Sequence, residues 1–220
     1  MDIQGVIFDL DGTLLDTLDD LADAANASLA HLGFPGHATD AYRYFVGDGL
    51  STLIERILPE GNRSQPEIAS CMDIFVQLYG RSWDIKSRPY AGIMEMLQQL
   101  QQAGVRMSIL SNKPHAFTQL CVQRYFATDT FAFVHGQREG VPRKPDPTGA
   151  MEIAALMNLP PHRLLYVGDT ATDMHTGNDA GMYTLGVLWG FRERQELEDN
   201  GAKTIISHPS EIIRYVHCNR

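Results

Sequence analysis

Apolar runs with strand character alternate with stretches of helical spacing over most of the chain. Ile93, Met96, Leu97 and Leu100 share one helical face, and Gly104 follows as a typical helix end. The same pattern predicts helices at residues 114–126, 147–157 and 171–180, and strands at residues 3–8, 105–110, 131–134, 163–167, 183–188 and 203–206. Short apolar strands separated by helices are typical of a parallel sheet with helices on both faces. We therefore predict a doubly wound α/β fold.

Residues 16–88 follow a different pattern, without a convincing strand. Leu18, Leu21 and Leu29 repeat at helical spacing, and the repeat ends at Gly33. Further helices are predicted at residues 40–45, 50–58 and 66–79. An all-helical block that interrupts an α/β domain is typical of a separate subdomain. We predict an α/β core of residues 1–15 and 89–220 and a helical cap of residues 16–88, with hinges near Thr17 and at residues 87–89.

Polar side chains follow several of the predicted strands. Asp9 and Asp11 follow the first strand, Ser111 and Asn112 follow the next, and Asp169 follows the strand at residues 163–167. In a doubly wound sheet, ligands bind beyond the carboxyl ends of the strands. Asp9 and Asp11 are two residues apart, so an extended chain would point both side chains to the same side. The sequence therefore predicts a ligand site at this edge of the sheet.

The acids at this edge predict a metal site. Asp173 lies four residues after Asp169 and adds a fourth carboxylate to Asp9 and Asp11. Crowded carboxylates raise one another's pKa unless a cation compensates. Hard oxygen ligands suit Mg²⁺, which binds a few carboxylates and keeps waters and substrate phosphate. Lys144, in the polar loop at residues 143–147, can add a positive charge.

Charge, cysteine content and hydrophobicity argue against several classes of protein. The 220 residues carry a formal charge of -9, which argues against a nucleic-acid-binding protein. Three widely spaced cysteines form neither a disulfide framework nor a metal motif, so a reducing compartment is expected. We find no basic and apolar leader and no apolar stretch long enough to span a membrane. A soluble, cytoplasmic protein that binds neither nucleic acid nor membrane is predicted.

Four ordered motifs resemble those of the haloacid dehalogenase-like hydrolases. They are Asp9-x-Asp11-Gly12-Thr13, Ser111-Asn112, Lys144, and Gly168-Asp169-Thr170-x-x-Asp173. The resemblance covers essentially the whole chain and includes a helical cap inserted after the first motif. Residues 46–49 in the cap, and residues 180–190 in the core, are similar to the phosphoglycolate phosphatase-like branch of that family.

The resemblance implies a Mg²⁺-dependent phosphatase that acts through an aspartyl phosphate. Asp9 would be the nucleophile, and Asp11 would be the general acid for the leaving group and then the base for water. Phosphate oxygens would be held by Lys144, Ser111 and the backbone around Gly12 and Asn112. The resemblance implies a metal site of Asp9, the Asp11 backbone carbonyl, Asp169, and Asp173 directly or through water.

The cap would choose the substrate, because the core motifs recognise only phosphate and metal. Gly47, Asp48 and Gly49 form a turn between two predicted helices, where glycines let the backbone approach a small ligand. The branch implies 2-phosphoglycolate as the phosphate ester. Asp48 suits a substrate carboxylate poorly, however, so a sugar or nucleoside hydroxyl is the alternative partner for this residue.

Other functions remain open at this point. A phosphomutase uses the same core motifs and differs in its cap, and a pyrophosphatase or nucleotidase of the same superfamily is a further alternative. A dehalogenase is disfavoured, because those relatives lack the aspartate present here as Asp11. A non-enzymatic phosphoacceptor module also has an acidic pocket with a lysine, but it lacks a helical insert.

Simpler structural interpretations stand beside these roles. Asp16 is predicted to be the N-cap of the following helix rather than a ligand. Asp173 could stabilise the first turn of its helix, and Ser111-Asn112 could form an ordinary turn. No two histidines have the spacing of a metal site, so no histidine ligand is expected.

Overall fold

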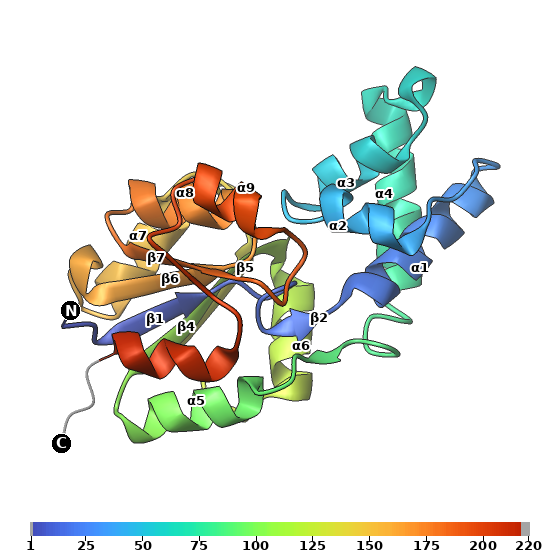
Figure 1. Ribbon diagram of the computed structural model, residues 1–220. Helices are drawn as coiled ribbons and strands as arrows, with labels where there is room; N and C mark the ends of the chain where they lie inside the picture. The colour runs from blue at the N-terminus through green and yellow to red at the C-terminus, as the bar shows by residue number, and fades with distance from the viewer. Residues whose placement is uncertain (1, 217–220) are drawn as a thin grey trace.

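A six-stranded parallel sheet forms the centre of the molecule, as the computed structural model of residues 2–216 shows (Figure 1). The strand order is β5-β4-β1-β6-β7-β8. The strands are β1 (Gly5–Phe8), β4 (Arg106–Pro114), β5 (Phe133–Gln137), β6 (Leu164–Gly168), β7 (Tyr183–Val187) and β8 (Thr204–Ile206). In sequence, the strands first build outward on one side of β1 and then on the other, which confirms the doubly wound fold.

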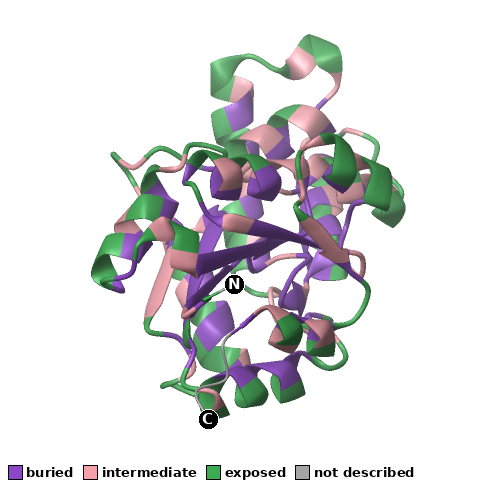
Figure 2. Cartoon of the chain, turned by 60° about the vertical axis from the view of Figure 1, so that its left-hand side comes forward, coloured by how far each residue is buried: buried purple, intermediate pink, exposed green. Residues whose placement is uncertain are grey.

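Helices cover both faces of the sheet (Figure 1). They are α5 (Ile93–Gln102), α6 (His115–Tyr125), α7 (Thr148–Leu156), α8 (Ala171–Asp179) and α9 (Arg194–Asp199), with short turns η3 (Pro161–Arg163) and η4 (Pro209–Tyr215). Val6 and Phe8 of β1 pack in one hydrophobic cluster with α5 and η4, whereas Ile7 packs in another with α7. Alternate residues of a strand point to opposite faces, so this short strand is buried on both sides, as Figure 2 shows for the central strands.

The helical block of the cap has a hydrophobic cluster of its own. It contains α1 (Leu18–His31), α2 (Tyr42–Phe45), α3 (Leu50–Ile57) and α4 (Gln65–Tyr79), with η1 (Thr39–Ala41) and η2 (Glu60–Asn62). Leu29, Ile54 and Tyr79 are among its buried members. The block stands beside the sheet, beyond the carboxyl ends of the strands (Figure 1). The division of the chain at residues 16 and 88 stays a prediction.

A short ribbon joins cap and core. β2 (Leu15–Asp16) pairs in antiparallel fashion with β3 (Arg88–Pro89), so the expectation of no strand in this block was wrong at its two ends. Two residue pairs are too few for any periodic signal. The N-cap prediction for Asp16 was also wrong. Thr17 occupies that position without a side-chain cap, and the Asp16 carboxylate accepts a hydrogen bond from Arg88 at 3.2 Å.

Strand β4 is longer than the apolar pattern predicted. It runs on through Ser111 and Asn112 to Pro114, with an irregularity in its pairing with β5 between Leu110 and Pro114. These two polar residues therefore lie inside a strand and not in a turn. Helices α9 and η4 were not predicted. Both are short, and α9 carries a single apolar residue, Leu197.

The sequence predicted that the cysteines form no disulfide framework and that no segment spans a membrane. Cys71 and Cys121 are buried and free, and Cys218 lies outside the described residues. Within residues 2–216 no helix combines the length and apolar character that a membrane span requires.

Candidate active site

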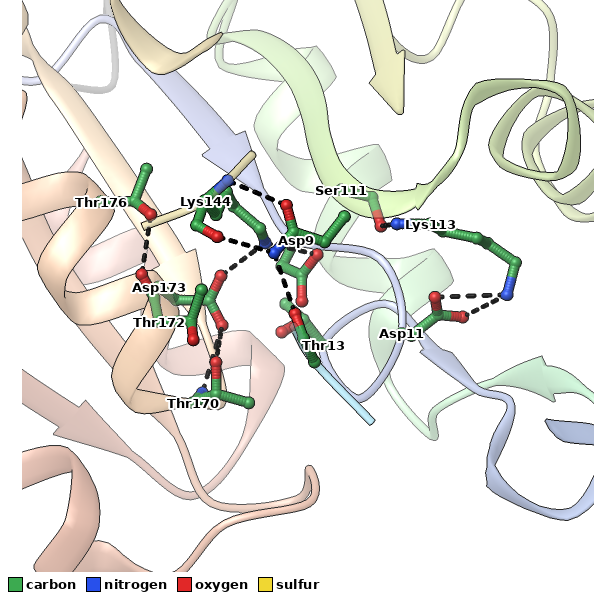
Figure 3. Close-up of polar contacts among 12 residues, drawn as sticks. Asp9, Asp11, Thr13, Ser111, Lys113, Lys144, Thr170, Thr172, Asp173 and Thr176 are labelled. Carbon is green, nitrogen blue, oxygen red and sulfur yellow. Dashed lines mark hydrogen bonds and ion pairs between the residues drawn. The ribbon is translucent and has the colours of Figure 1, made fainter. Parts of the chain in front are cut away.

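The motifs converge at the carboxyl ends of the two central strands. Phe8, the last residue of β1, is level with Ile109 of β4 and Val167 of β6. This register places Asp9, directly after β1, beside Asp169, directly after β6. Loops and helix starts then add the remaining motif residues, as Figure 3 shows for Lys144 and Asp173. The edge that the sequence predicted as the ligand site is therefore where these side chains meet.

Three buried carboxylates form a cluster that could hold a metal ion. One carboxylate oxygen from each of Asp9, Asp169 and Asp173 lies within 4.8 Å of the others. All three side chains are nearly inaccessible to solvent. Hard oxygen donors at this spacing fit a divalent cation such as Mg²⁺, and burial without a compensating cation is unfavourable. The chemistry of the donor set therefore matches the predicted metal site.

Asp173 has two roles in the geometry. Its second carboxylate oxygen accepts hydrogen bonds from the Thr170 amide at 3.2 Å and the Thr170 hydroxyl at 2.8 Å, which closes a capping box at the start of α8. Its first oxygen accepts a bond from Lys144. The structural interpretation as a helix-start residue and its membership of the acid cluster are therefore both correct, because the helix start fixes this carboxylate at the cluster.

Lys144 is buried between two carboxylates. Its Nζ lies 2.8 Å from Asp9 Oδ1 and 2.7 Å from Asp173 Oδ1. Burial alone lowers the pKa of Lys144, but the two neighbouring carboxylates raise it well above its ordinary value. The ammonium group therefore stays charged beside Asp9. Lys144 is therefore a buried site residue and not a solvated loop lysine.

Burial and like charge raise the pKa values of the clustered acids. The pKa of Asp169 rises to about 7, because the group is desolvated and faces Asp173. Donors limit this rise: the Thr13 hydroxyl binds Asp169 Oδ1 at 3.0 Å and the Phe191 amide binds Oδ2 at 2.8 Å. Burial also raises the pKa of Asp9, and Lys144 lowers it in part. A divalent cation among these groups would favour their charged forms.

Asp11 lies outside the acid cluster, contrary to the expectation for an extended chain. Its carboxylate accepts bonds from Lys113 Nζ at 3.0 Å and from the Thr17 hydroxyl at 2.7 Å. The chain turns after β1 and reaches Gly12 with φ near 88°, so Asp9 and Asp11 point to different partners (Figure 3). The expected clustering of four carboxylates was therefore wrong for the Asp11 side chain. A metal contact through its backbone carbonyl stays a prediction.

Two glycines allow the backbone to approach Asp169 closely. A Cβ on Gly12 would lie 2.3 Å from Asp169 Oδ2, and a Cβ on Gly190 would lie 2.3 Å from Asp169 Cβ. Gly12 also has a positive φ, which other residues rarely adopt. Any larger residue at these positions would displace the carboxylate from the cluster.

The polar end of β4 faces the same site. Asn112 donates to the Lys144 carbonyl at 3.0 Å and accepts from the Lys144 amide at 2.9 Å, so its side chain fixes the lysine loop. It also donates to the Gly47 carbonyl of the cap at 3.1 Å. The Ser111 hydroxyl accepts a bond from the Lys113 amide at 3.2 Å. Ser111 and Asn112 are therefore both held in place at the cleft.

The cap turn binds the core through Asp48. One carboxylate oxygen of Asp48 accepts a bond from Thr172 of α8 at 2.6 Å, and the other lies 2.5 Å from Arg56 of α3. Burial would raise the pKa of Asp48, but these two partners lower it below its ordinary value. Gly47 and Gly49 line the cleft, whereas Asp48 is not among its lining residues. The structure therefore places Asp48 at the contact between cap and core.

A cleft lies between the cap and the acid edge. Asp9, Asp11, Ser111 and Lys113 line its floor. Its walls are largely apolar, and include Leu21, Val46, Leu50, Leu53, Phe75, Pro114 and Phe117.

Sequence reasoning missed two polar residues of this cleft, Lys113 and Tyr79. Lys113 directly follows the second motif, and its burial depends on β4 continuing past Leu110. Tyr79 is the last residue of α4, and its hydroxyl accepts a bond from Lys113 Nζ at 2.8 Å. The position of Lys113 beside a motif was the one signal available for it, and nothing in the sequence distinguished Tyr79 from other core aromatics.

Comparisons with known proteins agree with this geometry. A profile described as haloacid dehalogenase-like hydrolase matches residues 6–187. Phosphoglycolate phosphatase from Psychrobacter arcticus is 31% identical over 222 residues, which cover 98% of this chain and 96% of that protein. N-acetylmuramic acid 6-phosphate phosphatase from Pseudomonas aeruginosa is 31% identical over 97% of this chain and 94% of that protein.

A solved structure extends the likeness to the fold. A crystal structure of a protein from Lactobacillus delbrueckii subsp. bulgaricus superposes with a TM-score of 0.92 at 28% identity, and covers 98% of each chain. The similarity therefore includes both the sheet and the helical block. The chain belongs to the haloacid dehalogenase-like hydrolases, and it is a phosphatase similar to the phosphoglycolate phosphatases.

Proposed function

We propose that the protein hydrolyses a small phosphate monoester in a Mg²⁺-dependent reaction through an aspartyl phosphate on Asp9. One observation carries the proposal: a carboxylate paired with a buried lysine lies next to two further carboxylates at the floor of a cleft. In this proposal Asp9, Asp169 and Asp173 hold Mg²⁺, with the Asp11 backbone carbonyl as a further ligand.

The chemistry requires these groups because both reactants are anions. A phosphate monoester repels a carboxylate nucleophile, and its uncatalysed hydrolysis is extremely slow. Bound Mg²⁺ would reduce this repulsion and stabilise charge on the phosphate oxygens. Lys144, whose ammonium group lies 2.8 Å from Asp9 Oδ1, would do the same. Ser111 and the backbone near Gly12 and Asn112 would hold the phosphate oxygens.

The reaction proceeds in two displacements. Asp9 attacks phosphorus, the ester oxygen leaves, and Asp11 supplies the proton that makes this oxygen an alcohol. Asp11 then accepts a proton from water as that water attacks the phosphorus of the aspartyl phosphate, which releases phosphate and restores Asp9. Two easier displacements replace one difficult step.

The first candidate substrate is 2-phosphoglycolate, on the strength of the relatives' names. A second candidate is a larger sugar phosphate. The relative named N-acetylmuramic acid 6-phosphate phosphatase supports it. In both cases we propose that residues 16–88 act as the cap that selects the ester, and that they move about the β2–β3 ribbon. The free cysteines support a reducing, cytoplasmic location.

A substrate panel tests this proposal. Phosphate release would be measured with 2-phosphoglycolate, N-acetylmuramic acid 6-phosphate, glucose 6-phosphate and pyrophosphate, each with Mg²⁺ and with excess chelator. We expect Mg²⁺-dependent release that is fastest with one of the first two esters. Transfer of phosphate to a sugar would instead indicate a mutase. An aspartyl phosphate that persists for minutes without turnover would indicate a phosphoacceptor module.

A further inference from the structure

Each of the two aspartates of the first motif forms an ion pair with a different buried lysine. Lys144 pairs with Asp9 in the acid cluster, whereas Lys113 pairs with Asp11 under the cap. Lys113 Nζ lies 3.0 Å from Asp11 Oδ1 and 3.3 Å from Oδ2, and Lys113 is only 7% exposed. The proposed reaction assigns a task to Lys144 but none to Lys113.

The second partner residue of Lys113 comes from the cap. Lys113 Nζ donates to the Tyr79 hydroxyl at 2.8 Å and lies 4.8 Å from the centre of the Tyr79 ring. An ammonium group has three donors, and Asp11 and Tyr79 account for them. The lysine therefore has no donor left over for solvent.

Packing holds this arrangement from both sides. The Tyr79 ring stacks on Phe75 of the cap at 5.3 Å and meets Phe117 of core helix α6 edge-on at 5.0 Å. On the core side, Thr17 at the hinge donates to Asp11 Oδ1 at 2.7 Å. Asp11 is thus held by Thr17 and by Lys113 of β4, and Tyr79 of the cap reaches it through Lys113.

A buried ion pair of this kind is weak support for stability alone. Desolvation of both charges opposes their attraction, and an apolar pair of similar volume is often as stable. Fixed geometry is the better attested result of such a pair, and a general acid depends on reaching the leaving oxygen within hydrogen-bond distance.

We propose that Lys113 is a positioning residue for Asp11, and that Tyr79 completes the arrangement from the cap. The chain Tyr79–Lys113–Asp11 aims the acid at the leaving oxygen when the cap is closed. This inference rests on the acid and base role proposed for Asp11.

A double-mutant cycle tests the inference. We would measure kcat and KM for Lys113→Met, Asp11→Asn and the double variant, with glycerol 2-phosphate, whose leaving alcohol is uncharged and must be protonated. General acid–base catalysis contributes about 10²–10⁴-fold, so misplacing the acid should lower kcat by roughly 10- to 100-fold with little change in KM. In the Asp11→Asn background Lys113→Met should cause no further loss. The loss should be smaller with p-nitrophenyl phosphate, which leaves without a proton.

A second variant keeps the test valid if Lys113→Met does not fold. Tyr79→Phe retains the ring that packs on Phe75 and removes only the hydroxyl, and it should lower kcat several-fold in the same leaving-group-dependent way. Lys203→Met is the matched control, because Lys203 lies 5.7 Å from the Tyr183 ring at a distance from the cleft. It should leave kcat and KM unchanged.

Two results would overturn the inference. Losses that multiply in the Asp11→Asn background would show that Lys113 acts independently of Asp11. A rise in KM confined to 2-phosphoglycolate would show that Lys113 binds the substrate carboxylate directly. If instead Asp11→Asn retained full activity, the proposed acid role itself would fail, which is a separate outcome.

Discussion

The core edge and the cap face meet at one cleft but differ in chemistry. The core contributes three buried carboxylates and two buried lysines, which follow strand ends, begin a helix or, for Lys144, lie in a loop that Asn112 fixes. The cap contributes mainly apolar walls, including Leu53 and Phe75, with Tyr79 as its polar contact to the floor. This difference supports the division of labour that we propose, in which the core performs the chemistry on the phosphate and the cap selects the group attached to it.

Several polar contacts join the cap turn to the core. The cap turn is tied to the core by hydrogen bonds to its own backbone, from Asn112 to the Gly47 carbonyl and from Arg192 to the Val46 carbonyl. Asp48 adds a side-chain bond to Thr172. Apolar contacts join the two regions as well, because Phe191 of the core is a buried member of the cap's hydrophobic cluster. The cap opening that we propose would therefore have to separate both polar and apolar contacts.

The largest effect is expected in the core, at Asp9. Asp9→Asn keeps the shape of the side chain and removes the nucleophilic charge, so turnover should fall by roughly 10⁴-fold or more, as for catalytic units in other enzymes. Steady-state phosphate release measures this, and a thermal melt close to that of the unaltered protein would show that the fold is intact. Substantial residual turnover would show that another residue is the nucleophile.

A smaller and more selective effect is expected at Asp11. Asp11→Asn should slow esters of poor leaving groups by about 10²-fold or more, because they need a proton as they leave. The loss should be smaller with an activated aryl phosphate. The comparison of glycerol 2-phosphate with p-nitrophenyl phosphate provides the measurement. Equal losses on both substrates would contradict the acid role.

The acid cluster should make stability depend on both metal and pH. Without metal, Asp169 binds a proton in the folded state up to a pKa of about 7, but in the unfolded state only up to its ordinary value of 3.8. The free energy of unfolding should therefore fall as pH rises from about 4 to 7, because the folded state holds more protons over that window. Bound Mg²⁺ should restore the free energy of unfolding that is lost at the higher pH.

Thermal melts with and without Mg²⁺ measure this linkage. At 100 times its Kd, a ligand stabilises the folded state by about 2.7 kcal/mol, which corresponds to roughly 5–10 °C for a chain of this size. The gain should be larger at pH 8 than at pH 5, where protons compete with the metal. In an Asp169→Asn variant the gain should vanish, and an undiminished gain there would place the metal elsewhere.

The smallest effect is expected in the cap, at Asp48. Asp48→Ala removes the bonds to Thr172 and Arg56 and should loosen cap closure. Turnover of p-nitrophenyl phosphate should change by only a few-fold, whereas the ranking of larger esters should shift. Asp23→Ala is the matched control, because Asp23 pairs with Lys86 on the exposed surface. The same ranking in both variants would place specificity outside this turn, most naturally in the loop at residues 136–143.

The sequence predicted the core much better than the cap contacts. Buried apolar strands and the residues that follow them placed Asp9, Asp169 and Asp173 at one edge, because parallel strands end together. The direction of Asp11 was not predictable, since it depends on the turn at Gly12. The burial of Lys113 depends on how far β4 pairs with β5, which no local pattern encodes.

Contacts between cap and core were also beyond the sequence pattern. Tyr79 and Asp48 lie in helices and turns that the pattern did locate, at residues 66–79 and 47–49. Their partners, Lys113 and Thr172, are distant in sequence and meet them only when two separate hydrophobic clusters dock. Helical spacing describes one element at a time, so it carries no information on this docking.

The most direct test of the account is where phosphate attaches during turnover. The protein would be mixed with Mg²⁺ and excess 2-phosphoglycolate or N-acetylmuramic acid 6-phosphate, quenched in acid within milliseconds, digested, and examined by mass spectrometry. We expect one phosphoryl group on the peptide that contains Asp9, and none in an Asp9→Asn variant. A phosphoryl group on another residue, or turnover with no labelled peptide at any quench time, would contradict the aspartyl-phosphate mechanism.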